Sequence, residues 1–593
     1  MTDSARLAQA LTELAGNPEQ LQAAGETHHC VVLAGPGSGK TKTLTTAIAR
    51  TLIEDVAEPQ GIACITYNNE CAVELETRLA KLGVEPGSRA FIGTVHSFAL
   101  SQVVMPYARC VLPEIGATVR IATEDERKAA VETAHAATIG RNEDPHGRWK
   151  FAEEKRRTQV DRSLAEWRGT NEELANFVEG YEAELRRQGL IDFDDMPLLA
   201  LRIVRENEWV QRALVAKFPV LFVDEYQDLG HALHQLVLLL CFQGGMRLFA
   251  VGDADQSMYG FLGASPELLQ SLSERDDVNA IQLRFNYRCG SSIIEASLGA
   301  LGEDRDYQGP EGGAVGTVDF HGVKGDLDAQ AAYVINDLIP RILESGIALD
   351  EIAVLYRNVK QADVLARAAF AAGIPVVRAD NNALIKRNSK LARFVEACAA
   401  WQCDGWRSAE PPFRRLVREA AALVYGPGPS REEVLQLESE LMGFLNPRIG
   451  VNPDAHQWLS SFRTDLINSW RPRSRNLLED WTSLDTMVAR TDPAKGEAIT
   501  LANLAGRVEG TGRLNMSTLH SAKGREWDAV IMFAMNNDVI PNYYEGKTAS
   551  GVREARRQFY VGVTRPRSQL HIVYSKGGHS PFVREVHQRL NAD

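Results

Sequence analysis

The sequence predicts an α/β protein of two lobes, in which parallel sheets are flanked by helices and each lobe carries a mainly helical insertion. A β-branched run at 30–34 passes through a glycine-rich loop into a segment with helical spacing, and a second apolar run at 218–223 ends in acidic residues. Strand-like runs return at 316–323 and 351–357. Because 593 residues exceed what one core supports, we expect several domains.

The expected domain boundaries follow the alternation of strand-rich and helix-rich stretches. The division has a first lobe, its charge-rich insertion, a second lobe and a second insertion: 1–100 with 198–285, then 101–197, then 286–395 with 508–593, and 396–507. The second insertion holds five tryptophans, which the helical periodicity favours as core residues over an exposed partner or duplex face.

Composition narrows the class of protein. The net charge is -13, so a nucleic acid would have to be held by a locally basic groove and not by bulk attraction. The eight cysteines form no CxxC pair and have no histidines at zinc spacing, which favours a reduced, cytoplasmic protein. The longest apolar run, 236–242, is too short to cross a bilayer, so we expect no membrane association.

The loop at 34–41 has the composition of a phosphate-binding loop, with alanine where the simplest pattern has glycine. A strand, a glycine loop and a helix N-terminus together direct backbone N–H groups at one anion. The residues expected to cradle the phosphates are Ala34, Gly35, Pro36, Gly37, Ser38 and Gly39. Lys40 is expected to reach the terminal phosphates and Thr41 to bind Mg²⁺.

Two acidic residues complete this site. Asp224 and Glu225 follow the apolar run at 218–223. Alone, such a pair is more often a helix cap or a solvated turn. Together with the phosphate loop, Asp224 is expected to hold Mg²⁺ and Glu225 to orient and deprotonate the attacking water. The sequence therefore predicts hydrolysis of a nucleoside triphosphate.

Five further stretches show which kind of hydrolase this is. They are "LFVDEYQD" (221–228), "FAVGDADQSMYGFLGA" (249–264), "LRFNYR" (283–288), "MSTLHSAKGREWDAVI" (516–531) and "RRQFYVGVTRPR" (556–567). Their order and spacing resemble the UvrD/Rep-like superfamily 1A DNA helicases from Asn17 to about Arg567. The resemblance implies two RecA-like P-loop NTPase domains that use ATP and Mg²⁺.

The resemblance also implies roles around the nucleotide. Gln20 looks like the family's adenine-reading glutamine, Tyr287 would stack on the adenine and Glu526 would accept a hydrogen bond from the ribose. Gln256 is placed to sense the γ-phosphate. Arg288 and Arg565 are expected to act as arginine fingers from across a domain cleft, so that closure and catalysis become one event.

Aromatic and polar residues after the strands predict a track for a nucleic acid strand. The expected contacts are Tyr67, His96, Tyr259, Phe261, Thr518 and His520. Base stacking on aromatic rings contributes roughly 1–3 kcal/mol per base and tolerates any sequence. Phe98 and Phe193 are interpreted as buried core residues.

The expected activity is 3′ to 5′ movement on single-stranded DNA with unwinding at single-strand/duplex junctions, in repair, replication or recombination. Many relatives have arginine at Leu262, tryptophan at Phe261 and "KGLEF" in place of "KGREW" (523–527), which bears on strand affinity. An alternative is a non-processive translocase subunit of a defence or repair complex that remodels protein–DNA complexes. A protein partner is expected on the insertion 396–507. A nucleotide-switch scaffold is disfavoured by the hydrolytic residues.

Overall fold

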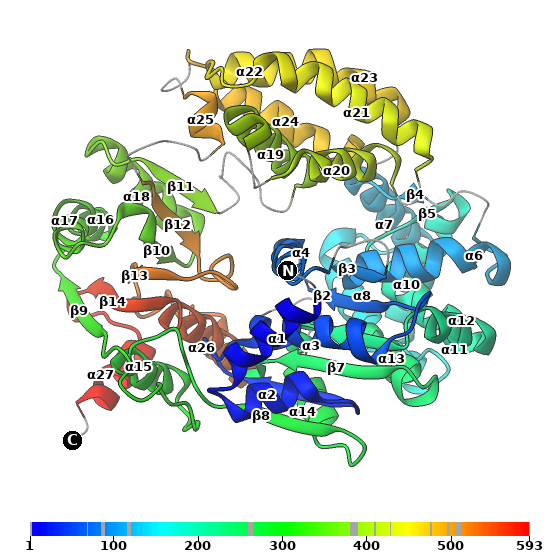
Figure 1. Cartoon of the computed structure of the whole chain (residues 1–593), viewed down its shortest axis with the longest axis horizontal. Coiled ribbons are helices and arrows are strands. Elements are labelled where there is room, and N and C mark those ends of the chain that lie inside the picture. Colours follow the sequence, from blue (N-terminus) through cyan, green and yellow to red (C-terminus); the bar gives the residue numbers. More distant parts are fainter. Residues whose placement is uncertain are drawn as a thin grey trace.

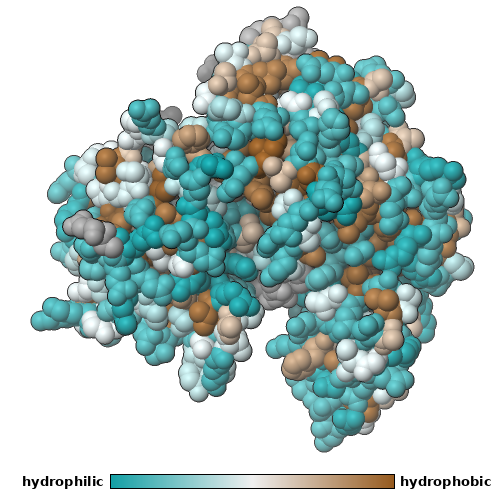
Figure 2. Space-filling view, turned by 90° about the horizontal axis from the view of Figure 1, so that it is seen from below, coloured by the Kyte–Doolittle hydropathy of each residue, from teal (hydrophilic) through white to brown (hydrophobic). Residues whose placement is uncertain are grey.

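The computed structural model contains two six-stranded parallel sheets with helices on both faces, and two further helical parts (Figure 1). It describes residues 3–67, 69–84, 89–115, 120–258, 265–379, 389–407, 411–426, 429–474, 477–494, 499–505 and 512–591. The predicted α/β class with parallel sheets and helical layers is confirmed. Figure 2 shows a mainly hydrophilic surface with scattered apolar groups and a deep notch in the outline.

The first sheet has the strand order β3-β2-β6-β7-β1-β8. Its strands are β1 (Cys30–Ala34), β2 (Ile62–Thr66), β3 (Ala90–Thr94), β6 (Val220–Val223), β7 (Arg247–Gly252) and β8 (Asn279–Leu283). Their near-continuous apolar runs suit a parallel sheet that is covered on both faces. Separate apolar clusters fill those two faces. The carboxyl ends of β1, β6 and β7 therefore lie side by side.

Helices of the first lobe cover this sheet. They are α1 (Asp3–Leu14), α2 (Pro18–Gly25), α3 (Lys40–Arg50), α4 (Asn69–Lys81), α5 (Val95–Phe98), α6 (Met105–Val111), α11 (Asp195–Glu206), α12 (Glu208–Lys217), α13 (His231–Leu238) and α14 (Pro266–Ser273). Apolar residues of α6 share one core with α11 and α13, although α6 follows the expected boundary at residue 100.

The first insertion has an apolar core of its own, which spans residues 122–190. Its elements are β4 (Arg120–Ile121), α7 (Glu124–Thr138), α8 (Pro145–Thr158), α9 (Glu166–Gly169), α10 (Glu172–Arg187) and β5 (Leu190–Ile191). Thr123 and Glu126 form a capping box that starts α7.

The second sheet has the order β11-β12-β10-β13-β14-β9. Its strands are β9 (Thr317–Val323), β10 (Ile352–Tyr356), β11 (Val376–Ala379), β12 (Leu514–Thr518), β13 (Trp527–Met532) and β14 (Pro566–Ser575). Flanking helices are α15 (Ser291–Leu301), α16 (Leu327–Tyr333), α17 (Ile339–Glu344), α18 (Val359–Ala371), α26 (Ala549–Val563) and α27 (Pro581–Leu590). The chain thus leaves this sheet after β11 and returns to it at β12.

The second insertion between β11 and β12 is a helical body at the top of Figure 1. Its helices are α19 (Lys390–Asp404), α20 (Phe413–Tyr425), α21 (Arg431–Leu445), α22 (Ala455–Ser461), α23 (Asn468–Trp470), α24 (Leu477–Arg490) and α25 (Leu501–Leu504). Trp401, Trp458 and Trp470 lie in its core, as the periodicity predicts, whereas Trp406 is 60% exposed. The side chain of Trp481 lies outside the described residues.

No helix in the part of the chain that the structure describes combines enough length with enough apolarity to span a membrane.

A buried ion network ties the first insertion to the first lobe. The Arg156 guanidinium is fully buried and donates to Glu182 (2.7 Å), to Asp192 (2.7 and 3.1 Å) and to Asp195 (2.6 Å). The two aspartates also accept from each other's backbone N–H groups. The network therefore fixes the turn at residues 192–195, which leads into α11.

Replacing Arg156 by Met should destabilise this part of the protein strongly, because the buried carboxylates would lose their counter-charge. We expect a loss of about 3–5 kcal/mol in urea unfolding followed by circular dichroism. The matched control is Arg168→Met, whose half-exposed pair with Glu179 should contribute less than about 1 kcal/mol. Equal midpoints for wild type and Arg156→Met would contradict a stabilising role for the network.

Candidate nucleotide and strand sites

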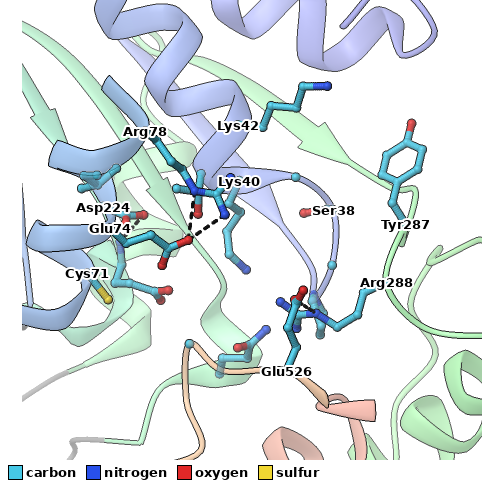
Figure 3. A pocket seen from close by; sticks show the side chains of 18 of the residues that line it. Ser38, Lys40, Lys42, Cys71, Glu74, Arg78, Asp224, Tyr287, Arg288 and Glu526 are labelled. Atoms are coloured by element: carbon cyan, nitrogen blue, oxygen red, sulfur yellow. Dashed lines mark hydrogen bonds and ion pairs between the residues drawn. The ribbon is translucent and has the colours of Figure 1, made fainter. Parts of the chain in front are cut away.

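A cavity of about 430 Å³ lies where the carboxyl ends of β1 and β6 meet the second lobe (Figure 3). It is lined by Pro36, Gly37, Ser38, Gly39, Lys40, Thr41, Lys42, Cys71, Glu74, Leu75, Arg78, Asp224, Glu225, Gln256, Tyr287, Arg288, Gly524, Glu526, Arg565 and Arg567. Most of the predicted nucleotide residues are among them. Lys42, Glu74, Arg78 and Arg567 were not expected there.

The phosphate loop depends on glycine at two positions. Gly37 and Gly39 have left-handed φ values of 67° and 81°. A Cβ atom on Gly39 would lie 2.2 Å from Nε2 of Gln20, which donates to the Ser38 carbonyl at 2.7 Å. A Cβ atom on Gly37 would lie 2.2 Å from Oδ1 of Asn286. The loop is therefore held from outside by Gln20, the residue expected to read adenine.

Lys40 begins α3 and turns back over the loop. Its Nζ donates to the carbonyls of Ala34 (3.0 Å) and Gly35 (3.2 Å) and lies 3.7 Å from Oδ2 of Asp253. The two carbonyls are neutral, and the contact with Asp253 is long. A phosphate would therefore be a stronger acceptor for the Lys40 ammonium. Burial raises the pKa of Asp253 to about 6 despite this lysine.

The acidic pair sits on the opposite wall of the cavity. Burial and the charge of Glu225 raise the pKa of Asp224 to about 7, against the attraction of Lys40. Burial also acts on Glu225, but the charges of Lys523 and Lys40 outweigh it and lower the pKa of this carboxyl. The two neighbouring acids thus differ, and Glu225 is the one held as a carboxylate.

A magnesium ion fits these residues. Thr41 and Asp224 line the same cavity, and Mg²⁺ commonly takes one or two protein oxygens together with phosphates and waters. Among the described residues there is no cluster of three or more His, Cys, Asp or Glu side chains that would form an all-protein metal cage.

Cations from the second lobe face the phosphate loop. Arg565 is buried, and its Nη2 donates to Oε1 of Gln256 at 3.2 Å. Burial and the neighbouring charge of Arg288 lower the pKa of Arg565 to about 10. Arg288 donates to Oε2 of Glu526 at 2.6 Å. Because the positive charge of Arg288 acts on Arg565, the site favours an anion between the two guanidinium groups.

The expected adenine side is formed by Tyr287 and the segment before α2. The Tyr287 hydroxyl accepts from Nδ2 of Asn17 at 2.9 Å, and the tyrosine remains partly exposed. Glu526, the expected ribose acceptor, is paired with Arg288 and with Arg567 (3.2 Å).

Lys523 of the second lobe crosses the cleft between the lobes. Its Nζ donates to Oδ2 of Asp228 and to the carbonyl of Gln256 (3.0 Å) and lies 3.6 Å from Oε2 of Glu225. Asp228 and Gln256 belong to the first lobe. Local sequence patterns did not indicate this contact, because its partners are some 270–300 residues away along the chain.

A second cavity of about 240 Å³ lies beside the ends of β2 and β3 and is lined partly by Tyr67, His96, Phe193 and Asp228. The His96 and Phe193 rings meet edge to face at 6.2 Å. Burial lowers the pKa of His96, so this ring is neutral near pH 7. The structure therefore brings two expected strand contacts together around a third aromatic ring.

The interpretation of Phe193 as a core residue was wrong, since its side chain is 52% exposed at this cavity. Asp192 and Asp195 bind Arg156 and hold the turn that carries Phe193, so that the ring points outward. Phe98 is buried, as expected. Tyr259, Phe261 and Leu262 lie outside the described residues.

Thr518 and His520 lie at the end of β12 in the second lobe, away from both cavities. The Thr518 hydroxyl accepts from the Ser521 backbone N–H at 3.0 Å. Burial and the charge of Arg357 lower the pKa of His520 to about 4, so it is neutral at physiological pH.

This combination of a phosphate loop, a buried acid pair and arginines from a second parallel-sheet lobe defines a two-lobed P-loop NTPase. The chain matches the UvrD/REP helicase N-terminal domain at residues 16–277 and the UvrD-like helicase C-terminal domain at residues 484–577. It belongs to the UvrD/Rep helicase family and is an enzyme of that class.

Several curated proteins are similar over most of their length. The ATP-dependent DNA helicase Rep of Buchnera aphidicola is 23% identical, with 92% of each chain covered. The ATP-dependent DNA helicase PcrA of Leuconostoc citreum is 24% identical over 95% of this chain and 81% of its own. DNA helicase II of Escherichia coli is 24% identical over 94% of this chain and 84% of its own.

The raised pKa of Asp224 has a consequence for stability. The folded-state pKa is about 7 and the ordinary value is 3.8, so between these pH values the unfolded chain ionises this carboxyl while the folded protein keeps it protonated. The resulting cost in folding free energy is absent below about pH 4, grows up to about pH 7 and stays at its full size above that pH. Asp224→Asn should therefore raise the melting temperature by about 1–3 °C at pH 8 and by less at pH 5. Differential scanning fluorimetry measures this, and an equal or larger gain at pH 5 would contradict the assignment.

Proposed function

We propose that this protein is an ATP- and Mg²⁺-dependent DNA helicase that moves 3′ to 5′ along single-stranded DNA and opens duplexes at single-strand/duplex junctions. The observation that carries the proposal is the shared cavity, where Arg288 and Arg565 of one lobe face Lys40 and Glu225 of the other. Such a cavity closes only when both lobes approach the same ligand. Hydrolysis of that ligand then changes the distance between the two lobes.

In this proposal the loop from Ala34 to Gly39 wraps the phosphates and Lys40 leaves its backbone carbonyls to bind them. Thr41 and Asp224 would hold Mg²⁺, which would supply positive charge beside the phosphates. Glu225 orients the attacking water and accepts its proton. Gln256 and the two arginines would bind the γ-phosphate and stabilise the charge that spreads over it in the transition state.

The strand would pass from the cavity of Tyr67, His96 and Phe193 towards Thr518 and His520 in the second lobe. Aromatic side chains and a neutral imidazole suit bases, because stacking does not require a particular sequence. The net charge of -13 means that this grip relies on local contacts and not on a positive surface overall.

Lys523 is proposed to couple the two sites. Its partner Asp228 lines the base cavity, while Glu225, 3.6 Å from the same ammonium, lines the nucleotide cavity. A movement of the residues that line this second cavity would therefore displace the Lys523 ammonium, which lies beside Glu225, the proposed water-activating carboxylate.

Repair, replication or recombination is the proposed setting, in the cytoplasm, with a protein partner on the second insertion. The half-exposed Trp406, which donates to Asn446 at 3.1 Å, is the surface aromatic that favours such a partner. The alternative activity, translocation that remodels protein–DNA complexes without processive unwinding, shares all the nucleotide chemistry.

The direct test is ATP-driven unwinding of duplexes with a 3′ or a 5′ single-stranded tail. We expect the protein to open the 3′-tailed duplex alone. The Glu225→Gln variant should bind ATP normally but hydrolyse it about 10²- to 10⁴-fold more slowly than the wild type. Strand-stimulated hydrolysis without unwinding of either substrate would support the translocase alternative. Preference for the 5′ tail, or near-normal turnover by Glu225→Gln, would contradict the proposal.

Lys523→Met and Asp228→Asn should lower the maximal strand-stimulated ATPase rate at least about fivefold, because each removes one end of the same ion pair. The double variant should be no worse than the more severe single variant. Asp277→Asn, an exposed aspartate paired with nearby Arg275, is the matched control. Fully additive losses in a steady-state ATPase cycle would mean that the two residues act separately.

A further inference from the structure

The described aromatic side chains with the greatest exposure include two adjacent tyrosines in the second lobe. Tyr543 is 64% exposed and Tyr544 is 79% exposed. Their rings meet edge to face at 5.5 Å, and Nζ of Lys547 lies 4.1 Å from the centre of the Tyr543 ring. Neither tyrosine lines the two cavities described above.

The turn that carries these rings is rigid. The Asn542 side chain accepts from the backbone N–H groups of Tyr544 (2.9 Å) and Glu545 (3.0 Å), and the Glu545 carboxylate accepts from the Asn542 N–H (2.9 Å). Glu545 also pairs with Arg357 at the end of β10. The rings are thus presented to solvent by a fixed backbone, which lowers the entropy cost of binding a ligand.

This turn lies at the carboxyl edge of the second sheet. It follows β13 and immediately precedes α26, and the ends of β10, β12 and β13 adjoin through the bonds Leu519 N–H to Tyr356 O (3.0 Å) and Phe533 N–H to Leu355 O (2.8 Å). Thr518 and His520 are at the same edge. The charge of Arg357, the partner of Glu545, is also felt by His520.

The helix that follows the turn, α26, is close to the first lobe. A Cβ atom on Gly551 would lie 2.5 Å from the carbonyl of Glu545, so the turn packs on the start of α26. The Ser265 hydroxyl and, less strongly, Arg557 and Arg553 of α26 lower the pKa of Glu267 in α14. That helix follows the segment holding Tyr259 and Phe261.

We propose that Tyr543, Tyr544 and Lys547 form an additional stacking site for the bases and phosphates of a single nucleic acid strand. Two exposed rings provide flat apolar faces, and Lys547, with the nearby Arg553 and Arg557, provides charge that suits a phosphate backbone. The site extends the strand track across the edge of the second lobe. It rests on the proposed strand-binding function, which it deepens.

The test compares binding of fluorescein-labelled oligo(dT) of about 8 and about 20 nucleotides by fluorescence anisotropy. Tyr543→Ala/Tyr544→Ala should raise the Kd for the longer strand at least about fivefold and change that for the shorter strand less than about twofold. Tyr543→Phe/Tyr544→Phe should restore wild-type affinity, because stacking needs the rings and not the hydroxyls.

Two control variants make the result specific. Phe370→Ala removes an equally exposed aromatic side chain (69%) from α18 of the same lobe and should bind both strands as wild type does. Phe193→Ala should weaken binding of both lengths. Binding is compared only among variants whose melting temperatures match that of the wild type.

Unchanged affinity of the double alanine variant for the longer strand would overturn the proposal. Failure of the phenylalanine variant to restore binding would overturn stacking as the mechanism. If the wild type itself bound neither strand, the proposed strand-binding function would fail instead, so the two failures are distinguishable.

Discussion

The burial of Arg565 beside a second arginine is the constraint on which the nucleotide site depends. Its lowered pKa expresses first the cost of taking its guanidinium group out of water and then the positive charge of Arg288. A polyphosphate placed between the arginines and Lys40 would remove that cost and add charge-assisted hydrogen bonds. In the proposed function, a bound polyphosphate would therefore favour approach of the lobes, and release of the cleaved phosphate would disfavour it.

The same electrostatic logic extends from the cleft to the strand cavity. Asp228 follows Glu225 by only three residues, yet Asp228 lines the second cavity and Glu225 lines the nucleotide cavity, because the chain turns sharply after β6 with Glu225 in the left-handed region (φ 53°). Lys523 lies against both carboxylates. A single short turn thus brings two binding sites within reach of one cation.

Local sequence patterns were sufficient for the α/β class and for the nucleotide cavity. The phosphate loop and the acid pair are contiguous motifs whose neighbours fix their geometry, so Lys40, Thr41, Asp224 and Glu225 could be placed from spacing alone. The arginines required the family resemblance, because each comes from a different, distant segment. The roles of all these residues remain predictions.

Long-range packing decided what the sequence did not indicate. Phe193 is apolar like a core residue, but Arg156, a buried arginine 37 positions earlier, binds Asp192 and Asp195 and holds the turn that directs the ring outward. The bridge made by Lys523 depends on how the two lobes meet. Tyr543 and Tyr544 carry no motif, and only their exposure on a rigid turn distinguishes them.

The Arg156 network gives the first insertion a mechanical part in the molecule. A base pressed against Phe193 would transmit load directly into four ionic side chains that cannot rearrange without exposing charge. In the proposed function, the insertion would thereby stiffen the turn that carries this ring. The stiffness of this turn, more than its affinity for a base, would determine how much of each closing movement of the lobes reaches the nucleic acid strand.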